Sequence, residues 1–438
     1  MKLPDDPQLL APWAPTATNA WDRPAAAHLF RRASFSGTPA EIDAALSGDV
    51  SAAVDALIRA QPDRETKAVR ALAAPIVAAS NPDALGAWWL RVLCDTSEPL
   101  REKCAFLWQG HFAVSAVKVE SLPLLYGHYE NCHRLGLGDL RALVRAMVRD
   151  PALLIYLDAD DNRKERPNEN LARELFELFL LGIGNYTELD VREAARALTG
   201  LTHKAGKPRF IAARHDAGLK TILGHTAAFG ADELIAHCFS RPGLARFLAQ
   251  RLLRSFVHPD VPPRVLAAAA DTLVSVDFNV AEFLRRILCS RLFFHPACRR
   301  ALVKSPVEYV IGVLRQFALT VDSNELQRVI AAMGQRLFYP PSVQGWPLGE
   351  RWISASRLIA RLRFAGQVAA LARGAARAAF VSELFAAQPD AAQATQAFTA
   401  FVVDGDLPPQ LTEQLVRLAD DPEGVIELVL GLPEMQLA

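Results

Sequence analysis

The sequence lacks long hydrophobic runs, close-spaced cysteines and an excess of charge of either sign. No stretch of its 438 residues approaches the ~18 consecutive apolar residues needed to cross a bilayer. The 48 Lys and Arg residues balance 48 Asp and Glu residues, whereas general nucleic-acid binders and polybasic membrane anchors carry a basic excess. We therefore expect neither a transmembrane segment nor a nucleic-acid partner.

Cysteine motifs and targeting signals are equally sparse. The six cysteines include no CxxC pair and have no regular spacing, which predicts reduced thiols rather than a disulfide framework. Residues 1–7 contain one basic residue, early prolines and no apolar core, so they do not have the features of a secretory signal. These features predict a cytoplasmic protein.

Recognised catalytic motifs are also missing. The sequence contains no GxGxxG after a strand, no GxxxxGK[ST], no GxSxG and no HExxH. It therefore gives no sign of a dinucleotide fold, a P-loop, a nucleophile elbow or a zinc-protease helix.

The sequence does contain a helical pattern along its whole length. Apolar residues make up 51% and charged residues 22%, a composition that excludes disorder and allows a large core. Thr38, Pro39 and Glu41 begin one helix as N-cap, first residue and capping-box partner. Further helices are expected over 83–93, 98–112, 140–148, 168–181, 187–198, 232–236, 242–256, 263–274, 280–288 and 305–317. No convincing alternating strand is visible, so the pattern predicts an all-α fold built as one large multi-helix domain.

Two long loops and a thinner C-terminal part interrupt this pattern. Residues 201–230 and 335–353 are irregular, and loops of that length in a compact protein are usually functional. Residues 366–400 are alanine-rich with weak caps and predict a peripheral helical pair. We expect a helical core over 1–365 and a C-terminal helical extension over 366–438 that packs on the core.

The densest polar cluster lies in the helix expected over 168–181. One face of that helix carries Glu169, Asn170, Arg173, Glu174 and Glu177. In one interpretation this face meets solvent, with Arg173 paired to Glu169 and Glu177. In the other, Glu174 and Glu177 point into a polar cavity as metal ligands or acid–base groups, as in helical bundles with metal sites.

Two histidines could complete such a site. His111 ends an aromatic helix, and His215 precedes Asp216, which could orient an imidazole or itself bind a metal. No close-spaced ligand pair exists, so sequence spacing alone predicts no metal. For each histidine the alternative is a hydrogen-bonded structural role.

Two loops have some, but not all, of the features of a functional site: one resembles a calcium-binding loop and the other a pocket wall. Asp158, Asp160, Asn162 and Glu169 fall at EF-hand positions, but Arg163 replaces the required glycine, so a solvated loop is expected. Residues 345–349, with Trp352 nearby, form an aromatic loop that either walls a pocket or packs as a cap over helix ends. The cap is the favoured interpretation.

A series of segments follows the motif order of a known family. Residues 167–179 match PNENxARELxEL and residues 186–191 match YTExDV. Other matches are the opening at 27–41, WxxHF at 108–112, ARALTGW at 194–201 with Leu201 in place of Trp, HDxGxK at 215–220, and the segments 304–308, 345–347 and 432–436. Together they resemble the DUF1800 family, bacterial proteins of uncharacterised function, over essentially the whole chain.

The resemblance implies an interior polar site. Its implied ligands for a divalent metal ion are His111, Glu174, Glu177 and His215. Its implied catalytic residues are Asn168, Arg173, Glu177, Asp216 and Lys220. Many relatives have a histidine where this chain has Phe179, so a site that uses that imidazole would be incomplete here. We expect a metal-assisted enzyme of unknown substrate, hydrolytic or oxidative.

Two other functions stay open. The family often looks exported and is often encoded beside DUF1501 proteins, which resemble sulfatases and alkaline phosphatases. The alternative is therefore a non-catalytic helical accessory or scaffold protein that binds a DUF1501-type partner, with any export as cargo of that partner. A small-molecule-binding protein without chemistry is the third possibility.

Overall fold

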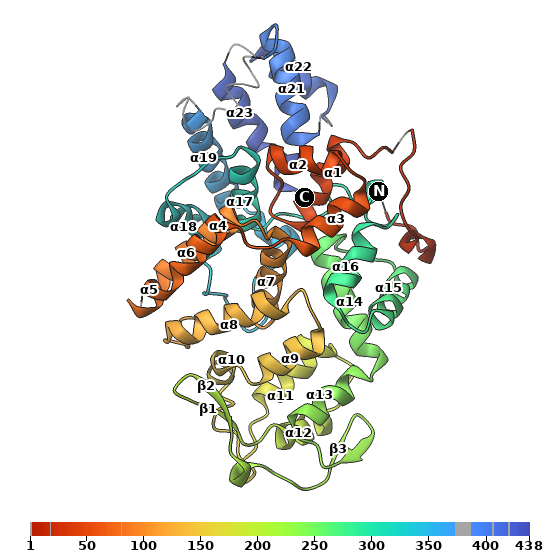
Figure 1. Cartoon of the computed structure of the whole chain (residues 1–438), viewed down its shortest axis with the longest axis vertical. Helices are drawn as coiled ribbons and strands as arrows, with labels where there is room; N and C mark the ends of the chain where they lie inside the picture. Colours follow the sequence, from red (N-terminus) through yellow and green to blue (C-terminus); the bar gives the residue numbers. More distant parts are fainter. Residues whose placement is uncertain (1, 18, 80, 373–386, 405–406, 419–420) are drawn as a thin grey trace.

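The chain folds mainly into helices, as the periodicity predicts (Figure 1). The computed structural model describes residues 2–17, 19–79, 81–372, 387–404, 407–418 and 421–438. Figure 1 shows an elongated molecule in which the N- and C-terminal helices share one end and the middle of the chain forms the other. The all-α class is confirmed.

The first part of the chain forms η1 and the helices that lead to α7 near the centre of the molecule. Its elements are η1 (Pro7–Leu10), α1 (Arg23–Ala33), α2 (Pro39–Leu46), α3 (Val50–Arg59), α4 (Arg64–Ala71), α5 (Ala73–Ala78), α6 (Pro82–Asp95) and α7 (Pro99–His111). The predicted capping box begins α2, because Thr38 Oγ1 accepts from Glu41 N and Glu41 Oε2 accepts from Thr38 N at 2.7 Å.

The middle of the chain forms the opposite end of the molecule. Its elements are α8 (Leu122–Leu135), α9 (Leu140–Val148), α10 (Pro151–Tyr156), α11 (Asn170–Glu174), η2 (Leu175–Leu180), α12 (Glu188–Ala197), β1 (Leu201–Lys204), β2 (Lys207–Phe210), η3 (Ala212–Arg214), β3 (Lys220–Ile222), β4 (His225–Ala227) and α13 (Ala231–Phe239). α9 has the bounds that the sequence predicts.

Two antiparallel hairpins correct the expectation that residues 201–230 contain no strand. β1 pairs with β2, and β3 pairs with β4. Each two-residue turn, 205–206 and 223–224, has positive φ at both positions and a glycine second, the backbone of a type I′ turn. The strands are three or four residues long, and β2 is exposed throughout. β3 alternates buried and exposed residues over only three positions, too few to predict a strand from the sequence.

The helix expected over 168–181 changes its winding partway. It begins as α11, and from Leu175 to Leu180 (η2) it is π-helical, with Leu181 N donating to Phe176 O at 2.9 Å. The wider turn buries Leu175, Phe176 and Phe179 in the core. Such turns occur frequently at functional sites.

The last part of the chain returns to the end that holds α1 to α3. Its elements are α14 (Pro242–Phe256), α15 (Pro263–Ser275), α16 (Val280–Leu288), η4 (Pro296–Cys298), α17 (Pro306–Gln316), α18 (Ser323–Ala332), η5 (Gly349–Trp352), α19 (Ala355–Ala372), α21 (Ala391–Val403), α22 (Pro409–Arg417), α23 (Pro422–Gly431) and α24 (Pro433–Gln436). The expected boundary at residue 365 falls inside α19, which packs along α23. Part of the expected helical pair, residues 373–386, lies outside the described residues.

Residues 436–438 pair with residues 302–304 against the core. Ala438 N donates to Leu302 O at 2.7 Å, and Lys304 N donates to Gln436 O at 2.8 Å. The Gln436 side chain accepts from Arg361 Nη1 at 2.8 Å. Among the described helices, none is long and apolar enough to cross a membrane.

Candidate functional site

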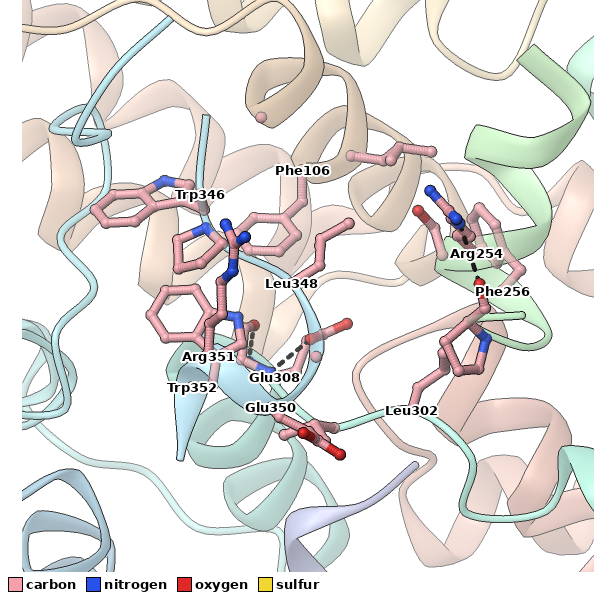
Figure 2. Close-up of a pocket in the computed structure, with 18 of the residues that line it drawn as sticks. Phe106, Arg254, Phe256, Leu302, Glu308, Trp346, Leu348, Glu350, Arg351 and Trp352 are labelled. Atoms are coloured by element: carbon pink, nitrogen blue, oxygen red, sulfur yellow. Dashed lines mark hydrogen bonds between the residues drawn. The ribbon is translucent and has the colours of Figure 1, made fainter. Parts of the chain in front are cut away.

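A cavity of about 530 Å³ lies among α7, the end of α14, the start of α17 and the loop that leads into η5. Its volume falls in the roughly 300–1,000 Å³ range typical of small-molecule sites. Figure 2 shows Trp346, Arg351 and Trp352 on one side of it and Arg254, Phe256 and Leu302 on the other. The lining is therefore mixed, with aromatic and aliphatic walls that also carry charged groups.

The aromatic loop forms one wall of this cavity. All residues from Trp346 to Trp352 line it, and the two indole rings lie 6.1 Å apart at an angle of 34°. The structure thus supports the pocket-wall interpretation of residues 345–349 over the favoured cap. Figure 2 shows Leu348 and Phe106 close to this wall.

A close approach of two backbones holds the loop against α7. Gly345 has φ +78° and lies so near Gly110 that a Cβ on it would be 2.0 Å from the Gly110 carbonyl oxygen. Glycine is the residue that satisfies both conditions without strain or clash. This contact places the neighbouring Trp346 at the C-terminal end of α7.

A buried ion pair forms another part of the lining. Lys103 Nζ on α7 donates to Glu308 Oε1 on α17 at 2.5 Å, and Ser305 N donates to Glu308 Oε2 at 2.9 Å. Burial alone would raise the pKa of Glu308, but the Lys103 charge and hydrogen bond hold that pKa below its usual range. The two charges neutralise each other at the wall.

Arg251 supplies positive charge that no acid balances directly. Burial, reinforced by Arg254 one turn further along α14, lowers the pKa of Arg251 to about 10, so the guanidinium stays charged at neutral pH. In the described part of the chain no carboxylate forms an ion pair with Arg251. Arg254 is exposed at the rim, where its Nε donates to Pro259 O at 3.0 Å.

The predicted metal ligands and catalytic residues do not line this cavity and lie in separate places. His111 is buried at the end of α7, and its Nε2 lies 3.0 Å from Phe179 O on η2. Burial, with a smaller contribution from Arg251, lowers the pKa of His111 to about 3, so its imidazole is neutral. The backbone contact joins α7 to the π-helical turn.

The predicted carboxylate pair lies where α11 continues into η2. Burial and then the charge of Glu177 raise the pKa of Glu174, and Tyr186 donates to Glu177 Oε2 at 3.1 Å. Arg173 instead pairs with Glu169 and Glu188 near the surface, at 3.0 and 2.8 Å. The solvated-face interpretation therefore holds for Arg173, but with Glu188 in the place expected for Glu177.

His215, Asp216 and Lys220 are brought together in one turn. Asp216 N donates to Thr199 Oγ1 at 2.8 Å, and Arg196 Nε donates to Asp216 Oδ2 at 2.7 Å, which holds the pKa of Asp216 below its usual range. Lys220 is buried and donates to the carbonyl oxygens of Asp216 and Gly218. These contacts interlock the segments 194–200 and 215–220.

Asn168 is hydrogen-bonded to the loop that begins at Asp158. Its Nδ2 donates to Asp158 O at 2.8 Å and its Oδ1 accepts from Asn170 N at 2.9 Å. Among the described residues, no group of three or more His, Cys, Asp or Glu side chains is arranged to hold a metal ion. The four predicted ligands thus do not share one coordination group here.

Sequence reasoning missed the charged and amide residues of the cavity. Arg251, Arg254 and Gln335 come from helical or loop positions where a polar residue is normally taken as solvated. The one available signal was a pair of arginines three residues apart near the end of the helix at 242–256.

Comparison with known proteins gives a family but no function. A family described as "Protein of unknown function (DUF1800)" matches residues 28–437. No curated protein and no solved structure matches the chain.

Proposed function

The chain belongs to the DUF1800 family, and from that premise we propose that it binds a small organic molecule in the cavity beside α7 and α14. The observation that carries this proposal is a cavity of about 530 Å³ with aromatic walls and a few charged and amide groups. Three segments on which the resemblance rests, 108–112, 304–308 and 345–347, contribute to its lining.

Filling the cavity tests the proposal. A Cβ on Gly110, which lines the cavity from α7, would meet no atom within 4 Å, so Gly110→Leu can be accommodated. Gly127 on α8 is equally open but does not line the cavity, which makes Gly127→Leu the matched control. Both substitutions replace a helical glycine and are expected to leave the fold intact or slightly more stable.

Binding is followed with the neutral fluorescent probe N-phenyl naphthylamine. The wild type and Gly127→Leu are expected to bind it saturably, and Gly110→Leu is expected to lose binding. Absence of saturable binding, or equal binding by the two glycine variants, would contradict the proposal.

The metal-assisted enzyme expected from the sequence stays a prediction, and one observation favours it. The charge of Glu177 contributes to the raised pKa of Glu174, so a divalent cation between the two carboxylates would relieve their repulsion. Element analysis of the purified full chain should then find metal that Glu174→Gln loses and that the control Glu120→Gln, at an exposed loop position, keeps. Metal-free wild-type protein would contradict this second candidate.

A further inference from the structure

The hydrogen bonds of the cavity walls are unbalanced. Within the described part of the chain, three buried N–H groups on lining residues have no hydrogen-bond partner: Gln335 Nε2, Trp346 Nε1 and Arg251 Nε. No lining residue has a buried acceptor left unpaired in the same way. The walls of the cavity therefore lack hydrogen-bond acceptors for these donors.

None of these three groups can change into an acceptor. Gln335 Oε1 accepts from Val307 N in the first turn of α17 at 3.0 Å, so an exchange of the amide atoms would set two donors against each other. Indole and guanidinium groups only donate. A buried donor without a partner costs roughly 1–3 kcal/mol, and a ligand that brings oxygen acceptors would remove that cost.

The charges along the walls are also unbalanced. The lining carries four basic side chains and three acidic ones. Lys103 and Glu308 form an ion pair, and the exposed Arg254 and Arg351 are matched in number by the exposed Asp260 and Glu350. One positive charge remains, that of the partly buried Arg251, and it suits a ligand with a single negative charge.

The rest of the lining is apolar. Phe106, Leu107, Phe256, Leu302, Leu348 and Trp352 present carbon atoms to the cavity. A fully hydrated ion such as inorganic phosphate would leave these surfaces without contact, whereas an organic body would cover them.

Resting on the proposed function, we propose that the ligand is an organic acid with one carboxylate. The carboxylate pairs with Arg251, the N–H groups of Gln335 and Trp346 donate to oxygen atoms of the ligand, and the apolar body lies against Phe106 and Leu348. The monoanionic head follows from the single uncompensated charge, and the need for oxygen acceptors follows from the three donors without a partner.

The test compares two probes of nearly equal shape, naphthoate and its uncharged amide, naphthamide, by isothermal titration of the full chain. We expect the wild type to bind naphthoate at least tenfold more tightly, as a charge-assisted hydrogen bond allows. Arg251→Gln should lose this preference while its affinity for naphthamide stays the same. The control Arg246→Gln, exposed on the same helix, should behave as the wild type.

The outcomes separate this proposal from the proposed function. Equal binding of both probes by the wild type, with loss of both in Gly110→Leu, would overturn the organic acid and keep the cavity as a binding site. Binding of neither probe would overturn both. Undiminished naphthoate binding by folded Arg251→Gln would overturn the role of Arg251, and the comparison of the two probes on the wild type needs no variant to fold.

Discussion

At the scale of single residues, Gly345 shows how one position can decide the shape of the cavity. A Cβ there would lie 2.0 Å from Gly110 O, whereas Gly349, also at positive φ, has open space around it. We expect Gly349→Ala to lower the free energy of unfolding by roughly 1–2 kcal/mol through backbone strain. Gly345→Ala should cost ~1–3 kcal/mol more because the loop must move away from α7.

Chemical denaturation of both variants measures this difference, and probe binding should weaken in Gly345→Ala because Trp346 moves with the loop. Equal destabilisation by the two substitutions would show that the contact between the backbones contributes nothing.

At the scale of elements, Thr199 ties the end of α12 to the segment that joins the two hairpins. Its Oγ1 accepts from Asp216 N at 2.8 Å and donates to Arg196 O at 2.6 Å. Thr199→Val keeps the shape and removes both bonds, which should cost roughly 1–3 kcal/mol because the Asp216 amide is left without a partner. We expect faster hydrogen exchange over 201–227, with α14 unchanged.

The half-exposed Thr202 on β1 offers the control, and Thr202→Val should leave exchange over 201–227 as it is in the wild type. Uniformly faster exchange in Thr199→Val, including α14, would instead mean that the bond stabilises the whole molecule.

At the scale of the whole molecule, a buried pair makes stability depend on pH. Burial alone would lower the pKa of His128, but Asp150, 3.0 Å away, raises it to about 10. The folded pKa thus exceeds the unfolded value of about 6.5, so this stabilisation is complete below pH ~6.5 and is lost as pH rises toward 10. We expect the melting temperature to fall across that range.

The double variant His128→Gln with Asp150→Asn should flatten this fall, and exposed His225→Gln should not. His128→Gln alone should lower the free energy of unfolding by roughly 3–5 kcal/mol because it leaves the Asp150 charge buried without its cation. The raised pKa of buried Cys132 acts in the same direction only at the alkaline end. A wild-type melting temperature that rises with pH between 7 and 10 would contradict the assignment.

Sequence patterns predicted what depends on neighbours along the chain. The capping box at Thr38 and the bounds of α9, α14 and α16 follow from local residues and appear as expected. The π-helical turn at 175–180 could not be predicted from the sequence, because its apolar residues fit an α-helix equally well. Packing in the core decides in favour of the wider turn. Tertiary packing, and not the spacing of apolar residues, determines the winding of this segment.

The cavity could not be predicted from the sequence for a related reason. Arg251, Glu308 and Trp346 are far apart in the sequence, and nothing in their spacing says that they share one space. Residues 167–179 and 215–220 are polar clusters in the sequence, yet the hydrogen bonds of Asn168, Asp216 and Lys220 hold neighbouring segments in place. A dense polar motif can therefore mark hydrogen bonds that hold segments together as readily as it marks a catalytic or binding site.

The segment 301–305 faces the cavity on one side and pairs with residues 436–438 on the other. If a contact on one side orders this segment, a contact on the other side then costs less conformational entropy. Occupancy of the cavity and the packing of residues 436–438 against 302–304 are then reciprocally coupled. If a ligand strengthens this packing by some factor, the packing strengthens ligand binding by the same factor. Because one segment makes both contacts, the packing of residues 436–438 reports whether the cavity is occupied.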